Sequence, residues 1–151
     1  MFIILTRNFP PEIGGMQNLM GGLANTLLNH GPVKVFADKS ENSEKYDNFS
    51  NANIERIGGI KLFRKYRKAN RFSEFVKKNQ NIRSVFFDHW KSVEKINLQL
   101  IKNIPTFCLI HSKEINHPKG SGLNKRVINS IKKVKYIIAN SNFTKNLGIS
   151  I

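Results

Sequence analysis

Short apolar runs alternate with longer segments of helical periodicity along the whole chain. The short runs predict six strands, at residues 2–6, 33–37, 54–57, 84–88, 106–110 and 135–139. Apolar residues spaced three and four apart predict helices at 16–30, 61–78, 91–103 and 120–134, and Ser141 opens a last helical turn. The polar segments 38–53 and 112–120 have no period, so we expect them to be loops.

This alternation predicts a doubly wound, Rossmann-like α/β domain, with helices on both faces of a mostly parallel six-stranded sheet. The later strands are almost continuously apolar, as expected for strands buried on both faces. A length of 151 residues fits one domain, residues 1–151. Ligands of such sheets bind beyond the carboxyl ends of the strands, which is where we expect the functional residues.

The loop at residues 9–15 is the most distinctive segment at that edge. Pro10 and Pro11 end the first strand, because proline cannot donate a backbone hydrogen bond. Gly14 and Gly15 then allow positive φ and a close approach of the backbone where the helix begins. The free amides of a helix N-terminus suit a phosphate or another anion.

Positive charge is the strongest bias in the composition. The net charge is +15, and pI is about 10.2. Basic residues cluster in the predicted helix 61–78, where they lie largely off the apolar stripe and could face an anionic membrane; they are Arg64, Lys65, Arg67, Lys68 and Arg71. A solvated helix face, or drift in an AT-rich coding sequence, explains the same pattern. Nucleic-acid binding is disfavoured, since Phe63, Tyr66 and Phe72 fall on the apolar stripe.

Several classes of site and segment are disfavoured by the sequence. No apolar run approaches the roughly 20 residues that span a bilayer, and no signal peptide is visible, so we expect a cytoplasmic protein. Cys108 lies in an apolar run and is expected to be a buried, inert thiol. The histidines do not pair at ligand spacing, so no metal is expected. No Gly-x-Gly-x-x-Gly follows the first strand, so NAD is disfavoured and Asp38 is interpreted as a solvated loop residue.

Two polar groups at strand ends are candidates for chemistry. His111 ends the fifth strand, and Glu114 follows close enough to orient or charge a site around it. Ser141 and Thr144 have the spacing of a helix N-cap and would also expose hydroxyl groups at the rim. His89 and His117 have less context, and we interpret them as structural.

Three motifs, in order, resemble the N-terminal domain of a family 4 retaining glycosyltransferase, an enzyme class with two facing Rossmann-like domains (the GT-B fold). They are Phe9-Pro10-Pro11 with Gly14-Gly15, Ile110-His111-Ser112-Lys113-Glu114, and Ala139-Asn140-Ser141-Asn142-Phe143-Thr144-Lys145. The resemblance spans essentially all 151 residues.

The resemblance implies roles for the motif residues. Gly14 and Gly15 would approach the donor diphosphate and the acceptor through their backbone, and His111 would contact the transferred sugar. Ser141 and Thr144 would line the cleft near the donor phosphates. The co-substrate would be a nucleotide sugar, the acceptor a glycan or a lipid-linked glycan, and no metal or other cofactor is implied, because amide donors and a helix dipole stabilise the leaving diphosphate.

The family's C-terminal, donor-binding domain has no counterpart in these residues. We therefore expect a truncated or split enzyme that needs a partner domain or chain and transfers little sugar alone. A location at the inner face of the membrane fits lipid-linked acceptors. The alternative is a non-catalytic, basic Rossmann-like module that binds a sugar, a nucleotide or nucleic acid.

Overall fold

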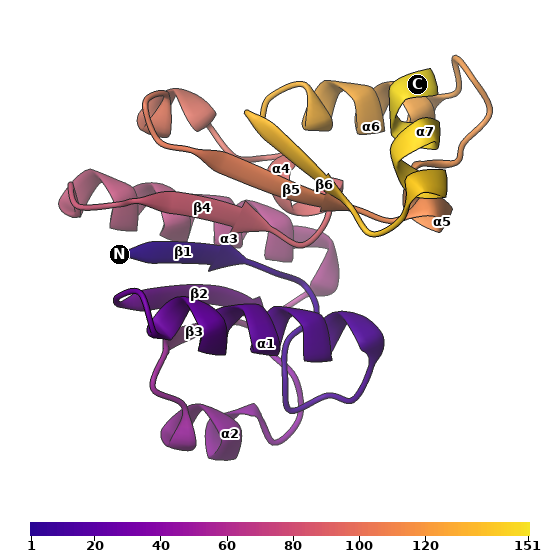
Figure 1. Cartoon of the computed structure of the whole chain (residues 1–151). Helices are drawn as coiled ribbons and strands as arrows, with labels where there is room; N and C mark the ends of the chain where they lie inside the picture. The colour runs from indigo at the N-terminus through magenta and orange to yellow at the C-terminus, as the bar shows by residue number, and fades with distance from the viewer.

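A computed structural model describes residues 1–151 and has six strands in one sheet (Figure 1). The strands are β1 (Phe2–Leu5), β2 (Val33–Asp38), β3 (Asn53–Ile57), β4 (Ser84–Phe87), β5 (Thr106–Ile110) and β6 (Tyr136–Ala139). Every neighbouring pair is parallel, and the order across the sheet is β3-β2-β1-β4-β5-β6. The predicted strands and the parallel sheet are confirmed.

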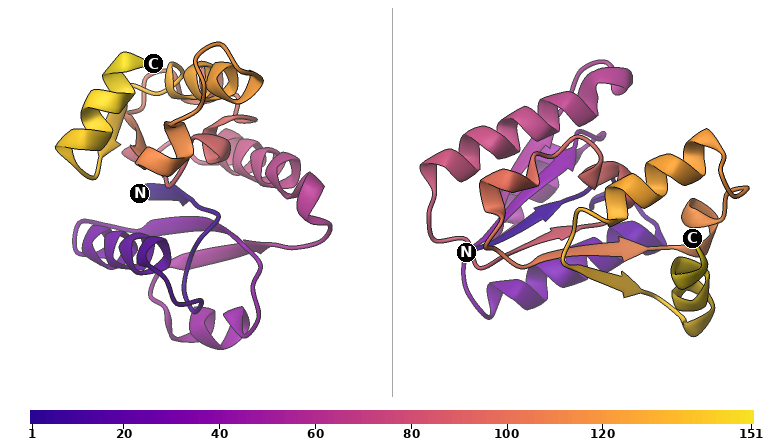
Figure 2. Two further views of the ribbon diagram at one scale, coloured as in Figure 1. Left: turned by 90° about the vertical axis from the view of Figure 1, so that its right-hand side faces the viewer. Right: turned by 90° about the horizontal axis from the view of Figure 1, so that it is seen from above.

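Helices lie on both sides of the sheet, as predicted for a doubly wound fold (Figure 2). They are α1 (Gly15–Leu28), α2 (Ser43–Phe49), α3 (Lys61–Lys78), α4 (Trp90–Val93), the 3₁₀ helix η1 (Leu98–Ile101), α5 (Ser112–Ile115), α6 (Gly122–Ile131) and α7 (Asn142–Ser150). None of them combines the length and the apolar character that crossing a bilayer requires.

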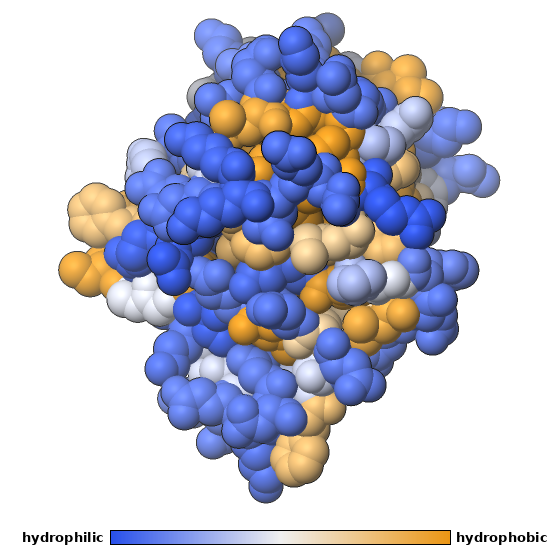
Figure 3. Space-filling model, turned by 90° about the vertical axis from the view of Figure 1, so that its left-hand side faces the viewer, coloured by the Kyte–Doolittle hydropathy of each residue, from blue (hydrophilic) through white to orange (hydrophobic).

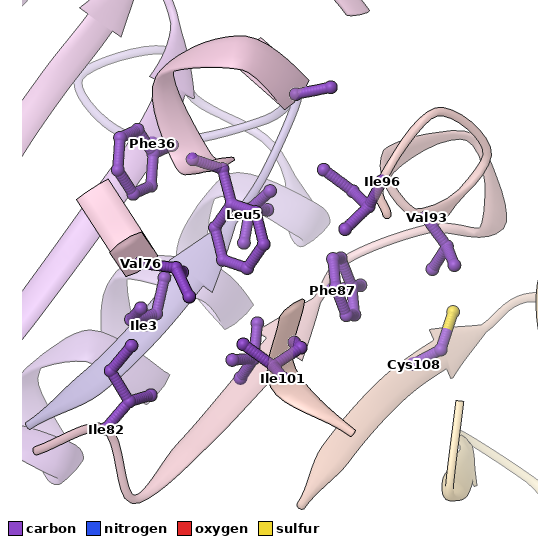
Figure 4. Packing of buried hydrophobic residues seen from close by; sticks show 13 residues of the cluster. Ile3, Leu5, Phe36, Val76, Ile82, Phe87, Val93, Ile96, Ile101 and Cys108 are labelled. Atoms are coloured by element: carbon purple, nitrogen blue, oxygen red, sulfur yellow. The ribbon is translucent and has the colours of Figure 1, made fainter. Parts of the chain in front are cut away.

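The alternation of side chains along β1 builds a separate core on each face of the sheet. Ile3 and Leu5 pack with Phe72 of α3 on one face, in a cluster that extends to Cys108 (Figure 4). Phe2 and Ile4 pack on the other face, under α1. Burial also raises the pKa of the Cys108 thiol far above its ordinary value, so the prediction of a buried, inert cysteine is confirmed.

Three predictions of local structure are wrong. The expected loops contain α2 and α5, two short helices whose apolar positions are too few to give a period. The expected helix 91–103 is instead α4 followed by η1. Each of these begins with its own cap: the His89 ring accepts from the backbone N–H of Lys91, and the Asn97 side chain accepts from that of Gln99. Local capping therefore divides a segment whose apolar pattern predicts one continuous helix.

Some apolar residues expected in the core are exposed. Tyr136, Ile137 and Ile138 are 52%, 47% and 42% exposed, so β6 is not buried on both faces. It is the edge strand, and the Tyr136 ring stacks on Phe107. The first turns of α3 are exposed too, whereas the buried part of its stripe starts at Lys68. On the face at the amino ends of the strands, polar side chains break up the apolar patches (Figure 3).

The loop at residues 9–15, which we call the proline loop, is fixed by a side chain of β3. The Arg56 guanidinium donates to the Pro10 carbonyl at 2.5 Å and pairs with Asp47 of α2 at 2.7 Å. Gly14 is extended, with φ 169°, and Gly15 is the first residue of α1, so the expected positive φ is wrong. A Cβ added at Gly14 would clash with Oε1 of Gln17, whereas nothing lies within 4 Å of a Cβ added at Gly15.

Two adjacent glycines inside α1 are expected to respond oppositely to alanine. A Cβ at Gly21 would lie 2.8 Å from the Pro10 ring, whereas one at Gly22 would meet nothing within 4 Å. Gly22→Ala should therefore raise the free energy of unfolding by about 1 kcal/mol, through helix propensity. Gly21→Ala should lower it by about 1–2 kcal/mol, because the clash outweighs that gain. Urea denaturation measures both, and a stabilising Gly21→Ala would contradict the close packing of α1 on the proline loop.

Candidate functional site

The carboxyl edge of the sheet has a switch point between β1 and β4 (Figure 2, left panel). The chain leaves β1 for α1 on one face and leaves β4 for α4 and η1, whose Val93 and Ile101 pack on the other. The connections that follow β1 and β4 therefore diverge, and in open α/β sheets a ligand crevice forms at that point.

The buried carboxylate of Asp88 holds the two diverging connections together. Its Oδ2 accepts hydrogen bonds from the Thr6 hydroxyl at 2.9 Å and from the Arg7 backbone N–H at 2.7 Å. Its Oδ1 accepts from the Ser92 hydroxyl of α4 at 2.6 Å. Asp88 is 0% exposed, so these three donors are its partners in place of water. The position of Arg7 at the edge thus depends on a residue of the loop after β4.

A recess of about 290 Å³, which we call the basic pocket, opens beside this link. Its wall combines seven basic side chains with only two carboxylates, Asp38 and Glu94. The basic residues come from four parts of the chain and are Arg7, Lys61, Arg64, Lys65, Lys68, Lys91 and Arg126. A second, wider hollow of about 910 Å³ adjoins the basic pocket and shares Arg7, Asp38, Lys61 and Arg64 with it.

Each carboxylate of the basic pocket is shared by two cations. Lys68 lies 2.5 Å from Asp38, and Arg64 approaches the same carboxylate at 3.9 Å. Glu94 pairs with Arg126 at 2.7 Å and with Lys65 at 3.1 Å, and the hydrogen bond from Arg126 is the main reason that the pKa of Glu94 falls to about 2. Asp38 is thus an ion-paired, one-fifth exposed wall residue, and its interpretation as a solvated loop residue is wrong.

These contacts also correct one residue of the expected membrane-facing side of α3, Lys68. Lys68 is 4% exposed and donates to the Thr6 carbonyl, so it faces the sheet and not a membrane. Arg67 donates to the carbonyls of Gly58 and Ile60, at 2.5 and 2.9 Å, and Arg71 pairs with Glu55 at 2.6 Å. The basic side chains of α3 are therefore largely engaged within the chain.

Three cations of the basic pocket have no carboxylate within ion-pair distance: Arg7, Lys61 and Lys91. Lys91 lies among the others, and burial together with the charge of Arg7 lowers its pKa, although Glu114 acts in the opposite direction. The wall thus holds like charges together with no internal counter-ion for them.

The predicted pair His111 and Glu114 forms a second cluster at this edge, together with His89. The Nδ1 atom of His89 accepts from the backbone N–H of Lys91 at 2.9 Å, so its Nε2 carries the hydrogen that points at Glu114, 3.0 Å away. Burial would raise the pKa of Glu114, but the hydrogen bond from His89 and the nearby His111 outweigh burial and lower it. The His111 Nε2 atom and the Glu114 Oε2 atom are buried without hydrogen-bond partners.

Trp90 connects the cluster to the basic pocket. Its indole N–H donates to the Glu114 carbonyl at 3.0 Å. Lys91 and Arg126 of the basic pocket lie over its ring, each 5.3 Å from the ring centre. The ring is 1% exposed and fixes the spacing between the two parts of the edge.

The other predicted site residues lie apart from these groups. The hydroxyl of Ser141 accepts from the backbone N–H of Thr144 at 3.1 Å, which confirms the N-cap, and also bonds the Thr144 hydroxyl at 3.0 Å. Thr144 is 1% exposed, and the place near the donor phosphates that the resemblance implies for it stays a prediction. Ser141 lines a separate hollow with Lys145, and Gly14 and Gly15 line neither the basic pocket nor its wider neighbour.

Sequence reasoning missed the basic pocket, because its cations come from distant parts of the chain. Arg7, Lys91 and Arg126 are far apart in sequence, and the pattern of α3 predicts only that its lysines and arginines share a helix face. The available signal was positional: Asp88-His89-Trp90 follows a buried strand at the switch point. His89, expected to be only structural, was also missed as the hydrogen-bond donor to Glu114.

The chain has no group of three or more histidine, cysteine, aspartate or glutamate side chains placed to hold a metal ion. Comparison with models of known protein families and with curated protein sequences gives no match for this chain.

Proposed function

We propose that this chain is the N-terminal, acceptor-side domain of a retaining glycosyltransferase, which moves a sugar from a nucleotide-sugar donor to a glycan or lipid-linked acceptor. The observation that carries the proposal is the unpartnered Nε2 of His111 beside the ionised Glu114 at the end of β5. A buried polar atom without a partner is costly, and a sugar hydroxyl supplies the missing hydrogen bond.

The surrounding edge supports the same proposal. A nucleotide-sugar donor leaves as a diphosphate, and fixed cations and helix amides stabilise the charge that develops on it. The basic pocket, linked to the cluster through Trp90, makes this edge of the chain strongly positive, which favours anionic substrates. A second Rossmann-like domain, in the same or another chain, would hold most of the donor, so we expect the residues described here to transfer little sugar alone.

A non-catalytic binding module is the second candidate. One observation favours it: Gly14, Gly15 and Ser141 do not share a hollow with the basic pocket, so the donor-facing motifs are not gathered in one cleft. A domain of this kind would bind a charged ligand at the switch point without chemistry.

Proton NMR of the histidine side chains tests the proposal directly. A panel of nucleotide sugars (UDP-glucose, UDP-N-acetylglucosamine and GDP-mannose) is titrated into the chain, with His111→Ala to assign the signals of His111. We expect at least one donor to shift the His111 ring signals while those of His30, exposed at the end of α1, stay in place. Equal shifts of His30, or binding that leaves His111 unmoved, would contradict the proposal, and the second result would favour the non-catalytic module.

A further inference from the structure

The charge of the basic pocket is arranged in two tiers. Asp38 and Glu94 are each shared between two cations, which fixes Arg64, Lys65, Lys68 and Arg126 in the walls. Arg7, Lys61 and Lys91 stand among them without a counter-ion. The ion-paired cations therefore form a fixed wall, and the three unpaired cations are left to bind a ligand.

The size and shape of the pocket limit that ligand. A volume of about 290 Å³ is at the small end of ligand pockets and suits one charged group with a monosaccharide-sized body. The cations converge on a recess from the β1 loop, α3, α4 and α6. Proteins that bind single strands instead spread their charge along a groove, with aromatic rings for the bases.

The identity of the unpaired cations indicates the chemistry. Arg7 presents a planar fork of N–H donors, which matches two phosphate oxygens, and Lys91 is a compact point charge beside it. The backbone of Arg7 is fixed by Asp88, and the ring of Trp90 supports Lys91, so both cations are attached to rigid parts of the edge. Clustered like charges repel one another, and a dianion relieves that repulsion.

We propose that the basic pocket binds the phosphate group of a phosphorylated ligand through Arg7 and Lys91. The inference rests on the proposed function and deepens it: the acceptor is a phosphorylated sugar or a glycan whose phosphate is buried in this pocket, beside the His111 cluster. The phosphate belongs either to a soluble sugar phosphate or to a lipid headgroup that carries a phosphomonoester, because both present the same dianionic group.

Calorimetry on the intact chain tests the pocket with three probes: inorganic phosphate, mannose 6-phosphate and mannose. We expect mannose 6-phosphate to bind more tightly than phosphate, and mannose not to bind measurably. The variant Arg7→Ala/Lys91→Ala should weaken mannose 6-phosphate at least tenfold, because it removes two charge-assisted contacts. Neither side chain has an ion pair to lose, so circular dichroism should show an unchanged fold.

A control for non-specific charge is Lys77→Ala, which removes one exposed charge from the far end of α3. It should leave the affinity for mannose 6-phosphate unchanged. Equal weakening by Lys77→Ala, wild-type affinity in Arg7→Ala/Lys91→Ala, or equal binding of mannose would overturn the proposal. Displacement of mannose 6-phosphate by a short single-stranded oligonucleotide would overturn it too, in favour of nucleic acid.

Vesicles of phosphatidylcholine with phosphatidylinositol 4-phosphate distinguish the two sources. If the vesicles compete with mannose 6-phosphate, and Arg7→Ala/Lys91→Ala abolishes vesicle binding, the pocket is supported and the phosphate is assigned to a lipid. If the vesicles leave mannose 6-phosphate binding unchanged, a soluble ligand is supported. Vesicle binding that survives in the double variant would place the lipid elsewhere and contradict the lipid source. If mannose 6-phosphate binds but no nucleotide sugar shifts the His111 signals, the glycosyltransferase proposal fails and the phosphate-binding pocket is retained. If a nucleotide sugar shifts the His111 signals but mannose 6-phosphate does not bind, only the proposal of a phosphate-binding pocket fails.

Discussion

Replacing Asp88 by alanine is expected to lower the free energy of unfolding by about 3–5 kcal/mol. The substitution removes the acceptor of the Arg7 backbone N–H and of the Ser92 hydroxyl, and it leaves the Thr6 hydroxyl only the Asn8 carbonyl. The position of Asp88 itself is 0% exposed. The substitution also releases the connection after β1 from the start of α4, so we expect phosphate binding by the basic pocket to fall with it. Urea denaturation measures the first effect, and calorimetry at a temperature where the variant is folded measures the second.

Asp88→Asn separates hydrogen-bond geometry from charge. The amide oxygen still accepts from Thr6 and Arg7, and the amide N–H₂ turns toward the Ser92 hydroxyl, which accepts as well as donates. We therefore expect a loss of only about 1–2 kcal/mol. A loss as large as that of Asp88→Ala would mean that the carboxylate acts mainly as a charge, opposite Lys68, and would contradict its role as a fixed acceptor.

Replacing Lys68 by methionine is expected to lower the free energy of unfolding by about 2–4 kcal/mol. Methionine keeps the length of the side chain, but it leaves Asp38 with only the distant Arg64 and leaves the Thr6 carbonyl without its donor. Burial lowers the pKa of Lys68, and the carboxylates of Asp38 and Asp88 oppose that change, so the ammonium depends on both for its charge. The denaturation midpoint in urea reports the loss.

A double-mutant cycle tests whether Asp38 is the ion-pair partner on which Lys68 depends. Lys68→Met/Asp38→Asn removes both charges, so it should cost at least about 1 kcal/mol less than the sum of the single variants. Arg71→Met, on the exposed side of the same helix, should leave the midpoint unchanged. Additive single variants would show that the contact between Lys68 and Asp38 contributes little, and that the cost of Lys68→Met is lost packing.

The sequence predicted the sheet because its signals are local and repeated. Most strands are apolar runs, each strand is followed by a glycine or a polar residue, and α1 and α3 carry clear periods. The segments that failed are governed by single side chains. His89 and Asn97 cap two short helices inside residues 91–103, and Tyr46 orders α2 by packing on Phe9, 6.1 Å away between ring centres. No period reveals such contacts.

The functional edge was predicted only in its outline. The rule that ligands bind at the carboxyl ends of parallel strands located His111 and Glu114 at the rim, but it does not say which side chains from distant elements meet there. The pairing of Lys68 with Asp38, and the placement of Arg126 over Trp90, depend on how α3 and α6 cross the sheet. The basic side chains of α3, which the sequence predicts to be a helix surface, therefore include four that line the wall of the basic pocket.

The buried position of Cys108 makes this chain well suited to site-directed spectroscopy. Its thiol is the only one in the sequence and is 0% exposed, so reagents that react with thiolates in solution should not reach it in the folded protein. A single engineered cysteine at an exposed site such as Glu12 or Lys39, both on the rim of the wider hollow, would carry a fluorophore or spin label with no background. Labels at both sites together then make distances across the carboxyl edge measurable.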